Sequence, residues 1–269
     1  MGDGMIPRRG EDGVRRVITD KAWRQLEPIL RRILSPRGAP PKLGLREFLE
    51  AVLYIDRTGV PWRDLPPCFG AWDAVYQRFR RWQRNGAWEA LWRGLQAPAA
   101  ASARRLFVDS TVVRAHQHAA GGPGLEPDRD LGRSRGGFGT KIHLAACDER
   151  TALGVVLTAG QAGDAPAFEP TLCDVPDETT ATAVVADRAY DSDEIRADLA
   201  AAGFEVVIPA RSNRVDPPPH DAEKYKERQK VERLVSRLKR MRRVATRYEK
   251  LSGAFLAMVH IACAASILL

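Results

Sequence analysis

RLFVDST at residues 105–111 and TAVVADRAY at residues 182–190 decide how this chain folds. In each stretch a short apolar run ends at an aspartate, Asp109 in the first and Asp187 in the second. Apolar runs of this length are typical of buried strands. A single Asp at a strand end is commonly a turn residue or a helix cap. Two such ends in neighbouring strands also indicate a site at the edge of an open α/β sheet.

Outward from these two stretches, strand and helix patterns alternate to the end of the chain. The further expected strands are TKIHLAACDE (140–149), ALGVVLTAG (152–160) and FEVVIPA (204–210), and the expected helices are 164–172, 192–203 and a long basic helix from about Glu223. The resulting order, β-β-β-α-β-α-β-α, is that of a ribonuclease H-like mixed sheet flanked by helices. We therefore predict an α/β fold with a catalytic domain over residues 104–269.

The preceding part of the chain has helical periodicity and predicts an all-helical domain over residues 18–98. Thr19 and Asp20 can cap its first helix. Its last helix carries arginines, including Arg78 and Arg81, and short helices joined by tight turns resemble a helix-turn-helix DNA reader. A plain helical cap is the alternative. Residues 1–17 are expected to be disordered, and their charges argue against a signal peptide.

The net charge of +8 is distributed unevenly along the chain. Residues 1–98 carry +7, residues 99–210 carry −7 and residues 211–250 carry +8. Clustered Lys and Arg suit a polyphosphate partner, and an acidic middle suits cation-binding carboxylates. Solvated helix faces are the alternative explanation of the basic segments.

The apolar run AFLAMVHIACAASILL, residues 254–269, is shorter than the roughly 20 residues that cross a bilayer and contains His260. It predicts a buried C-terminal helix, and we expect no membrane partner. The 4 cysteines lie far apart without zinc-type spacing. Free, scattered cysteines of this kind are typical of a reducing compartment, so we expect a cytoplasmic protein.

A third acidic candidate lies in the basic helix. Tyr225, Arg228, Glu232 and Lys239 have the pattern Y-x2-R-x3-E-x6-K. On a continuous helix these residues fall within roughly 60° of one another, beside an apolar stripe that would dock the helix on the sheet. Glu232 would then face the sheet, while Arg228 and Lys239 could hold DNA phosphates. An ordinary i,i+4 ion pair between Arg228 and Glu232 is the alternative.

Asp109, Asp187 and Glu232 together suit phosphoryl transfer. Mg²⁺ prefers oxygen ligands and keeps several waters, so a few carboxylates are enough to hold it, with Mn²⁺ as a possible substitute. Two such ions about 4 Å apart can activate a water or a 3′-hydroxyl and stabilise the leaving oxygen. We therefore assign the three carboxylates as metal ligands.

The motifs as a whole resemble those of the DDE transposases of bacterial insertion sequences, specifically the insertion-sequence-five family. The similarity extends from about Ile18 to the C-terminus and is most specific in the Y-x2-R-x3-E-x6-K helix. Its other segments are WRDLP (62–66), VDSTVVRAHQHAAG (108–121), GGFGTKIH (136–143) and ADRAYDSDEIR (186–196).

The resemblance implies that Asp109, Asp187 and Glu232 form a catalytic triad, with Tyr225, Arg228 and Lys239 as the signature around the glutamate. It also implies a transposase that cleaves and rejoins double-stranded DNA at the inverted-repeat ends of an element and at a target. Pairing two ends implies at least a homodimer on DNA. Two alternatives are a catalytically inactive, transposase-derived DNA-binding protein or repressor, and a nuclease that cuts without joining.

Several polar residues near these motifs allow more than one interpretation. Arg133, Arg135 and Lys141 in RSRGGFGTK could hold a DNA backbone, or the glycines could form a hairpin turn. His116 and His118 are better as a polar loop or a DNA contact than as zinc ligands. His143 is expected to be held by a hydrogen bond. Finally, Asp191, Asp193 and Glu194 are expected to cap the helix after Asp187.

Overall fold

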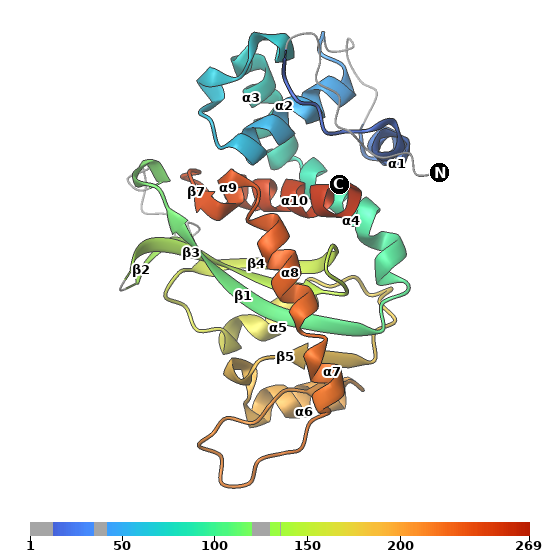
Figure 1. Cartoon of the computed structure of the whole chain (residues 1–269), viewed down its shortest axis with the longest axis vertical. Coiled ribbons are helices and arrows are strands. Elements are labelled where there is room, and N and C mark those ends of the chain that lie inside the picture. Colours follow the sequence, from blue (N-terminus) through green and yellow to red (C-terminus); the bar gives the residue numbers. More distant parts are fainter. Residues whose placement is uncertain (1–12, 35–41, 120–129, 135) are drawn as a thin grey trace.

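The computed structural model describes residues 13–34, 42–119, 130–134 and 136–269. A layer of helices lies over a mixed sheet, and the C-terminal helix lies between the two (Figure 1). The helices of the upper layer are α1 (Asp20–Ile33), α2 (Leu45–Thr58), α3 (Trp72–Arg84) and α4 (Ala87–Ala100), with the 3-10 turns η1 (Trp62–Asp64) and η2 (Pro67–Phe69) between α2 and α3. The all-helical N-terminal region expected from the sequence is therefore present.

Local signals in the sequence account for α1. The Thr19 side chain accepts a hydrogen bond from the backbone N–H of Ala22, as expected of an N-cap. Leu26 and Leu30, one turn apart, are buried on the same face of this helix. The cap and the apolar spacing together position α1 against α4, its main partner.

The sheet confirms the ribonuclease H-like layout. Its strands are β1 (Arg105–Ala115), β2 (Gly132–Ser134), β3 (Gly137–Ala146), β4 (Ala152–Ala159), β5 (Ala183–Ala186), β6 (Glu205–Val207) and β7 (Thr246–Arg247). β3 lies antiparallel between β1 and β4, whereas β5 and β6 continue from β1 as parallel neighbours. The helices α5 (Phe168–Cys173) and α6 (Asp193–Ala201) make the crossovers to the parallel strands.

Two strands were not predicted. β2 forms a hairpin with β3, with Gly132 opposite Gly139, which agrees with the hairpin alternative for this glycine-rich segment. β7 pairs with the end of β1 at Arg114 and Ala115. These strands have three and two residues, which is too short for an alternating pattern to be visible in a sequence.

The expected long basic helix is broken into α7 (Ala222–Lys226) and α8 (Gln229–Leu238), and α9 (Arg242–Ala245) follows. At the break, the N–H of Arg228 bonds the carbonyl of Tyr225 at 3.0 Å, which is a tighter turn than an α-helix makes. The side chain of Glu227 reaches Arg105 on β1 at 2.6 Å. Contacts with the sheet therefore fix the break, and no Pro or Gly marks it in the sequence.

The C-terminal helix α10 (Ser252–Leu268) is buried, as its apolar sequence predicts. Its residues share one hydrophobic core with α1–α4 and with one face of the sheet, while α5 and α6 cover a second core on the other face. The ring of His260 stacks on Trp92 of α4 with 4.7 Å between centroids. No helix in the described part of the chain is long and apolar enough to cross a membrane.

Residues 13–17, the first that the structure describes, belong to the segment that was expected to be disordered. Residues 13–17 lie along α2, where the N–H groups of Val17 and Ile18 donate to the carboxylate of Glu50 at 2.6 to 3.0 Å. Residues 1–12, the rest of the segment expected to be disordered, lie outside the described residues. Glu50 is 2% exposed, so these backbone donors are its main compensation.

Asp56 on α2 predicts an unusual pH dependence of stability. Its side chain is fully buried and neither carboxyl oxygen has a hydrogen-bond partner. Burial raises the pKa of Asp56 well above its usual range, Glu249 adds to the rise, and Arg243 opposes it. A folded-state pKa above the unfolded value favours folding at low pH, and this contribution is lost as pH rises from about 4 toward the folded pKa.

We therefore expect the free energy of unfolding to fall less between pH 5 and pH 8 in Asp56→Asn than in the parent. The difference in free energy of unfolding between the variant and the parent should change by about 1.4 kcal/mol for each pH unit over which Asp56 is protonated in the folded chain and ionised in the unfolded one. Urea unfolding at both pH values measures it, with exposed Asp64→Asn as the control. Parallel pH profiles for parent and variant would contradict the assignment.

Candidate active site

Asp109 and Asp187 stand side by side because of the register between β1 and β5. The two strands pair in parallel up to Val108 and Ala186, so the next residue in each strand is the aspartate. β5 ends there, whereas β1 continues to Ala115. The expectation that the β1 strand leaves the sheet at Asp109 was therefore wrong. Asp109 lies in mid-strand, at the point where its parallel neighbour stops.

Asp187 is held by the turn that follows β5. It is the N-cap of the 3-10 turn η6 (Arg188–Tyr190), and its Oδ1 accepts the N–H of Ala189 at 2.7 Å. Asp109 accepts the N–H of Ser110 at 2.9 Å. Each carboxylate thus has one oxygen fixed by its own backbone, and the other oxygen is free to face a partner.

The third carboxylate joins the first two through Arg228. Arg228 Nη2 lies 3.3 Å from Asp109 Oδ2 and 3.8 Å from Asp187 Oδ2, and Nη1 pairs with Glu232 Oε1. The i,i+4 ion pair between Arg228 and Glu232 therefore exists, but it is one side of a four-residue cluster. The acidic residues from β1, β5 and α8 gather around a single guanidinium.

Charge and burial differ across this cluster. The side chains of Asp109, Asp187 and Glu232 are 16%, 33% and 54% exposed. Burial raises the pKa of Asp109, Arg228 and the Ser110 N–H oppose the rise, and the carboxylates of Asp187 and Glu232 add to it. Burial disfavours the charge on Arg228, but the carboxylates outweigh it and raise the pKa of this arginine. Arg228 is therefore a permanent cation in the centre.

The chemistry of this donor set suits a hard divalent cation, since carboxylate oxygens are the ligands that Mg²⁺ and Mn²⁺ prefer. The present side-chain positions do not form a finished site. Within the described residues, no three His, Cys, Asp or Glu side chains are placed to hold a metal ion together. The guanidinium occupies the space among the three carboxylates, so a metal ion would bind here only after Arg228 moves aside.

Lys141 was expected to contact DNA but is nearly buried, at 9% exposed. Its Nζ donates to Asp164 Oδ1 at 2.8 Å and to the Ala162 carbonyl at 2.6 Å. Ser110 Oγ donates to the same carboxylate at 2.7 Å. Ser110 and Lys141 lie on the face of the sheet opposite to Asp109, because side chains alternate along a strand. This buried network supports β1 from behind.

The role of Asp164 was not identified from the sequence, where it is only the first residue of the helix expected over 164–172. His143, on the same face, behaves as expected: its Nε2 lies 2.8 Å from Thr158 Oγ1. Burial lowers the pKa of His143 to about 4, so this imidazole is neutral at pH 7.

The other residues proposed to contact DNA are placed differently from one another. Arg81 and Arg133 are exposed, and Lys239 donates to the Val112 carbonyl at 3.2 Å beside β1. Tyr225 is partly buried against the core. Arg135 lies outside the described residues.

Arg78 points inward instead of outward. It donates to the Leu43 carbonyl at 2.9 Å, and its guanidinium lies 4.3 Å from the ring centroid of Phe48. Burial lowers the pKa of Arg78 to about 10, with Arg81 adding to the effect. Its contacts are those of a structural residue.

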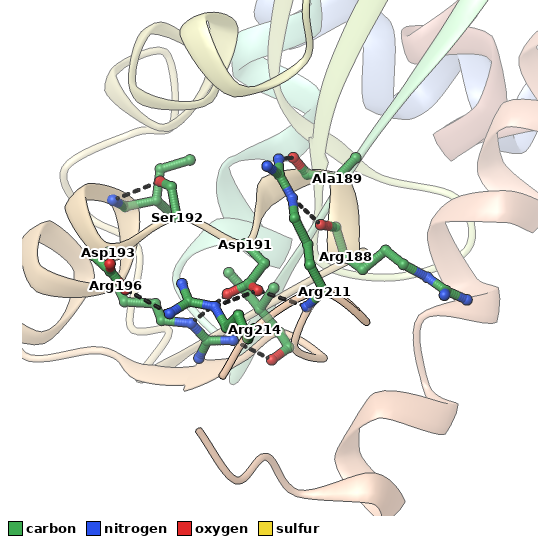
Figure 2. Close-up of polar contacts among 10 residues, drawn as sticks. Arg188, Ala189, Asp191, Ser192, Asp193, Arg196, Arg211 and Arg214 are labelled. Atoms are coloured by element: carbon green, nitrogen blue, oxygen red, sulfur yellow. Dashed lines mark hydrogen bonds and ion pairs between the residues drawn. The ribbon is translucent and has the colours of Figure 1, made fainter. Parts of the chain in front are cut away.

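A buried ion cluster fixes the loop that carries Asp187 (Figure 2). The side chain of Asp191 is fully buried and accepts from Arg196 Nε, Arg214 Nε and the N–H of Arg211, each at 2.7 Å. The side chain of Arg211 in turn donates to the carbonyls of η6 residues Arg188 and Ala189. The segment after β6 thereby clamps the turn that begins at Asp187.

The N-cap of α6 differs from the prediction, which assigned it to Asp191, Asp193 and Glu194. Ser192 is the N-cap, and its hydroxyl accepts the N–H of Ile195 at 3.2 Å. Asp193 and Glu194 lie in the first turn, where they favour the helix dipole. Asp191 does not cap the helix, because its carboxylate is committed to the arginines.

Two family models match the chain. Residues 18–92 match the model described as a putative transposase of the IS4/5 family, and residues 100–267 match the model of a transposase DDE domain.

Similar proteins come from several bacteria. A putative transposase for insertion sequence element IS6501 from Brucella ovis is 37% identical over 129 residues, which are 46% of this chain and 95% of that protein. An uncharacterized protein of Sinorhizobium fredii is 39% identical over 41% of this chain and 82% of its own length. An insertion element IS402 protein of Burkholderia cepacia, also uncharacterized, is 34% identical over 37% and 74%.

Solved structures with a related shape are distant. A piggyBac transposase synaptic complex with hairpin DNA has a TM-score of 0.45 and 12% identity, covering 93% of this chain and 72% of that one. A Mos1 mariner paired-end complex with Mn has a TM-score of 0.30 and 14% identity, covering 90% and 86%.

Asp191→Asn tests the clamp through the pH dependence of stability. Burial alone would raise the pKa of Asp191, but bonds from Arg214, Arg211 and Arg196 hold it far below its usual range. Because the pKa is lower in the folded state than in the unfolded state, ionised Asp191 stabilises the fold above about pH 4. This contribution is lost as pH falls toward the folded-state pKa.

We expect Asp191→Asn to lower the free energy of unfolding by on the order of 2 kcal/mol at pH 7, because it leaves buried guanidinium groups without their counterion. The deficit should narrow below pH 4. Asp193→Asn is the matched control: its side chain is 90% exposed and bonds the same Arg214, so the loss should be under about 0.5 kcal/mol. Equal losses in the two variants, or a deficit independent of pH, would contradict the clamp.

Proposed function

Because this chain belongs to the family of transposases defined by a DDE domain, which acts in DNA transposition, we propose that it cleaves DNA strands and transfers them with Asp109, Asp187 and Glu232 as its catalytic residues. The observation that supports this assignment is the convergence of the three carboxylates on one guanidinium from β1, β5 and α8. Side chains 45 to 123 positions apart in the sequence thus share one cation.

We propose that the same three carboxylates hold Mg²⁺, with Mn²⁺ as a substitute, once Arg228 withdraws. Bound ions of this kind activate the attacking water or 3′-hydroxyl and stabilise the leaving oxygen. Asp109 and Asp187, each fixed by a backbone N–H, would supply the rigid part of the site. Glu232, the most exposed of the three, would complete it from α8.

Arg228 and Lys239 would then hold phosphates of the DNA. Arg228 lies among the carboxylates, and a guanidinium released from them can form a two-pronged bond to a phosphate. Lys239 Nζ lies beside β1 at the Val112 carbonyl, three residues beyond Asp109. Both cations therefore border the place where the scissile phosphate would lie.

The proposed partner is double-stranded DNA, as element ends and as target. Two ends must be brought together, so we propose a homodimer or larger assembly on DNA. We place this activity in the cytoplasm, where that substrate would be. A catalytically inactive repressor is not favoured, because the three carboxylates are present and gathered. A nuclease that cuts without joining differs from the proposal only in its products.

Asp109→Asn and Glu232→Gln test the catalytic assignment. With Mg²⁺ and duplex DNA carrying the sequences that flank the gene, each variant should lower strand cleavage at least about 100-fold, because charge stabilisation of the reacting phosphate is lost. Gel analysis of nicked and joined products measures cleavage and transfer separately.

Glu223→Gln is the control for these variants, since Glu223 is exposed and pairs with its neighbour Lys226 at 2.7 Å. Its cleavage rate should match the parent. Parent-level cleavage by Asp109→Asn would refute the triad, whereas nicked products without joined ones from the parent would favour the nuclease.

Arg228→Gln tests whether the guanidinium and the metal ion compete for one place. Removing a positive charge that lies 3.3 and 3.8 Å from two carboxylates should tighten Mn²⁺ binding at least about 10-fold in the absence of DNA, measured by calorimetry. In EDTA the variant should melt at a lower temperature than the parent, and added Mn²⁺ should remove this difference.

Arg233→Gln is the matched control on the same helix: Arg233 is 58% exposed and pairs with Glu149 at 2.9 Å. It should leave Mn²⁺ affinity unchanged. If both variants bind Mn²⁺ as the parent does, Arg228 does not occupy the metal position.

A further inference from the structure

A groove of about 790 Å³ lies between α3 and the segment that joins β7 to α10, away from the carboxylates. Five of its lining side chains are aromatic: Phe79, which is buried, and the four residues Trp62, Trp72, Tyr76 and Tyr248. All four are only partly buried, so part of each ring surface is open to the groove. Trp62 belongs to the WRDLP segment, and Trp72 is the first residue of α3.

The aromatic side chains are held in place by one another and by one arginine. The ring of Trp62 lies 5.2 Å from that of Tyr76 and 5.0 Å from that of Phe79. The guanidinium of Arg243 lies 5.8 Å from the Trp62 ring and 5.4 Å from the Tyr248 ring. The groove is thus bordered by rings of fixed orientation that come from distant parts of the chain.

Arg243 does not itself present a free charge. It is 5% exposed, pairs with Glu249 at 2.6 Å and donates to the Val60 carbonyl at 2.7 Å. The acidic lining residue Glu249 is neutralised by the same contact. A negatively charged ligand would therefore meet no uncompensated carboxylate from Glu249.

Four other cations line the groove: Arg63, Arg80, Arg84 and Lys250. Within the described part of the chain, none of them has a carboxylate oxygen within 4.0 Å. Arg63 lies over the Trp72 ring at 5.6 Å. Uncompensated cations interleaved with open aromatic rings are the arrangement that binds single-stranded nucleic acid, because the backbone takes the charge and the bases take the rings.

We propose that this groove binds an unpaired stretch of the DNA substrate, with bases stacked on its aromatic side chains. A duplex cannot use the rings, because its bases are already stacked on each other, so the aromatic lining favours separated strands. The inference rests on the proposed function for the presence of DNA, and it adds a second DNA site with a different preference.

The position of the groove agrees with a strand that continues from the carboxylates. Tyr248 lies 5.0 Å from the ring of His116, the residue that follows β1, and the N–H of His116 bonds the Arg247 carbonyl at 2.8 Å. From Asp109 to His116 the chain extends about 20 Å at the rise of a strand. A few unstacked nucleotides span that distance.

Trp72→Ala tests the proposal in a chain that cannot cut. In full-length protein carrying Asp109→Asn, with EDTA present, fluorescence anisotropy measures binding of a labelled oligo(dT) of about 15 nucleotides, within the site sizes of single-strand binders. Trp72→Ala should weaken this binding about 10-fold, and binding of a duplex carrying the flanking sequences should change less than about 2-fold. A stacked base is worth about 1 to 3 kcal/mol.

Trp23→Ala is the matched control, because Trp23 is also partly buried and also lies under an arginine, Arg46 at 6.0 Å, but outside the groove. It should leave oligo(dT) binding unchanged. Lys250→Gln provides a second variant at an exposed position. It should reduce the slope of log affinity against log salt by about 0.7 for the single strand.

The outcomes separate this proposal from its alternatives. Equal oligo(dT) affinity in Trp72→Ala and Trp23→Ala, with an unchanged salt slope in Lys250→Gln, overturns it. Equal losses on oligo(dT) and duplex also overturn it, in favour of a duplex backbone surface. Displacement of oligo(dT) by polyglutamate at the same charge concentration would also overturn it, because the groove would then bind any polyanion, including acidic peptides. Because neither metal nor cleavage is needed, failure here leaves the catalytic proposal intact, and the reverse is also true.

Discussion

Three carboxylates placed near one another repel, and in this chain the guanidinium of Arg228 balances that repulsion. Unit charges 4 Å apart interact by about 4 kcal/mol at an effective dielectric constant of 20, so a cation among the carboxylates stabilises their grouping. The same ion pairs tie α8 to β1 and to the turn after β5. The position of α8 on the sheet and the grouping of the acidic residues therefore depend on each other.

The three members of the cluster are not equally constrained. Asp109 and Asp187 come from paired strands whose register places them side by side, and each accepts a backbone N–H. Glu232 comes from a helix and is 54% exposed, so only its pairing with Arg228 orients it. The strand pair supplies fixed geometry and the helix supplies the adjustable member.

Much of the architecture could be predicted because its signals are local. The apolar runs before Asp109 and Asp187, the Thr19 cap and the continuous apolar run of the C-terminal helix each depend on neighbouring residues only. The break at Arg228 could not be predicted, since Glu227 and Arg228 interrupt the helix by reaching β1, more than one hundred residues earlier. The buried position of Lys141 likewise depends on Asp164, which the sequence shows only as the first residue of an expected helix.

Charged residues were the hardest to place for the same reason. Arg78 lies three residues after buried Val75 and four before buried Trp82, so it borders the buried face of α3, where its guanidinium packs over the ring of Phe48. Asp191 stands where a helix cap is common, yet arginines from later in the chain claim its carboxylate. Long charged side chains choose partners across the fold, and periodicity within one element cannot reveal those partners.

The C-terminal helix determines how the helical layer relates to the carboxylates. α10 buries 12 of its 17 residues, and it contacts α2, α3 and α4 on one side and α8 and β4 on the other. Arg243 reinforces the same connection by joining the Val60 carbonyl and Glu249. A helical layer fastened in this way cannot swing as a separate module without exposing this core to water. DNA held by the upper layer would therefore be held at a set distance from Asp109.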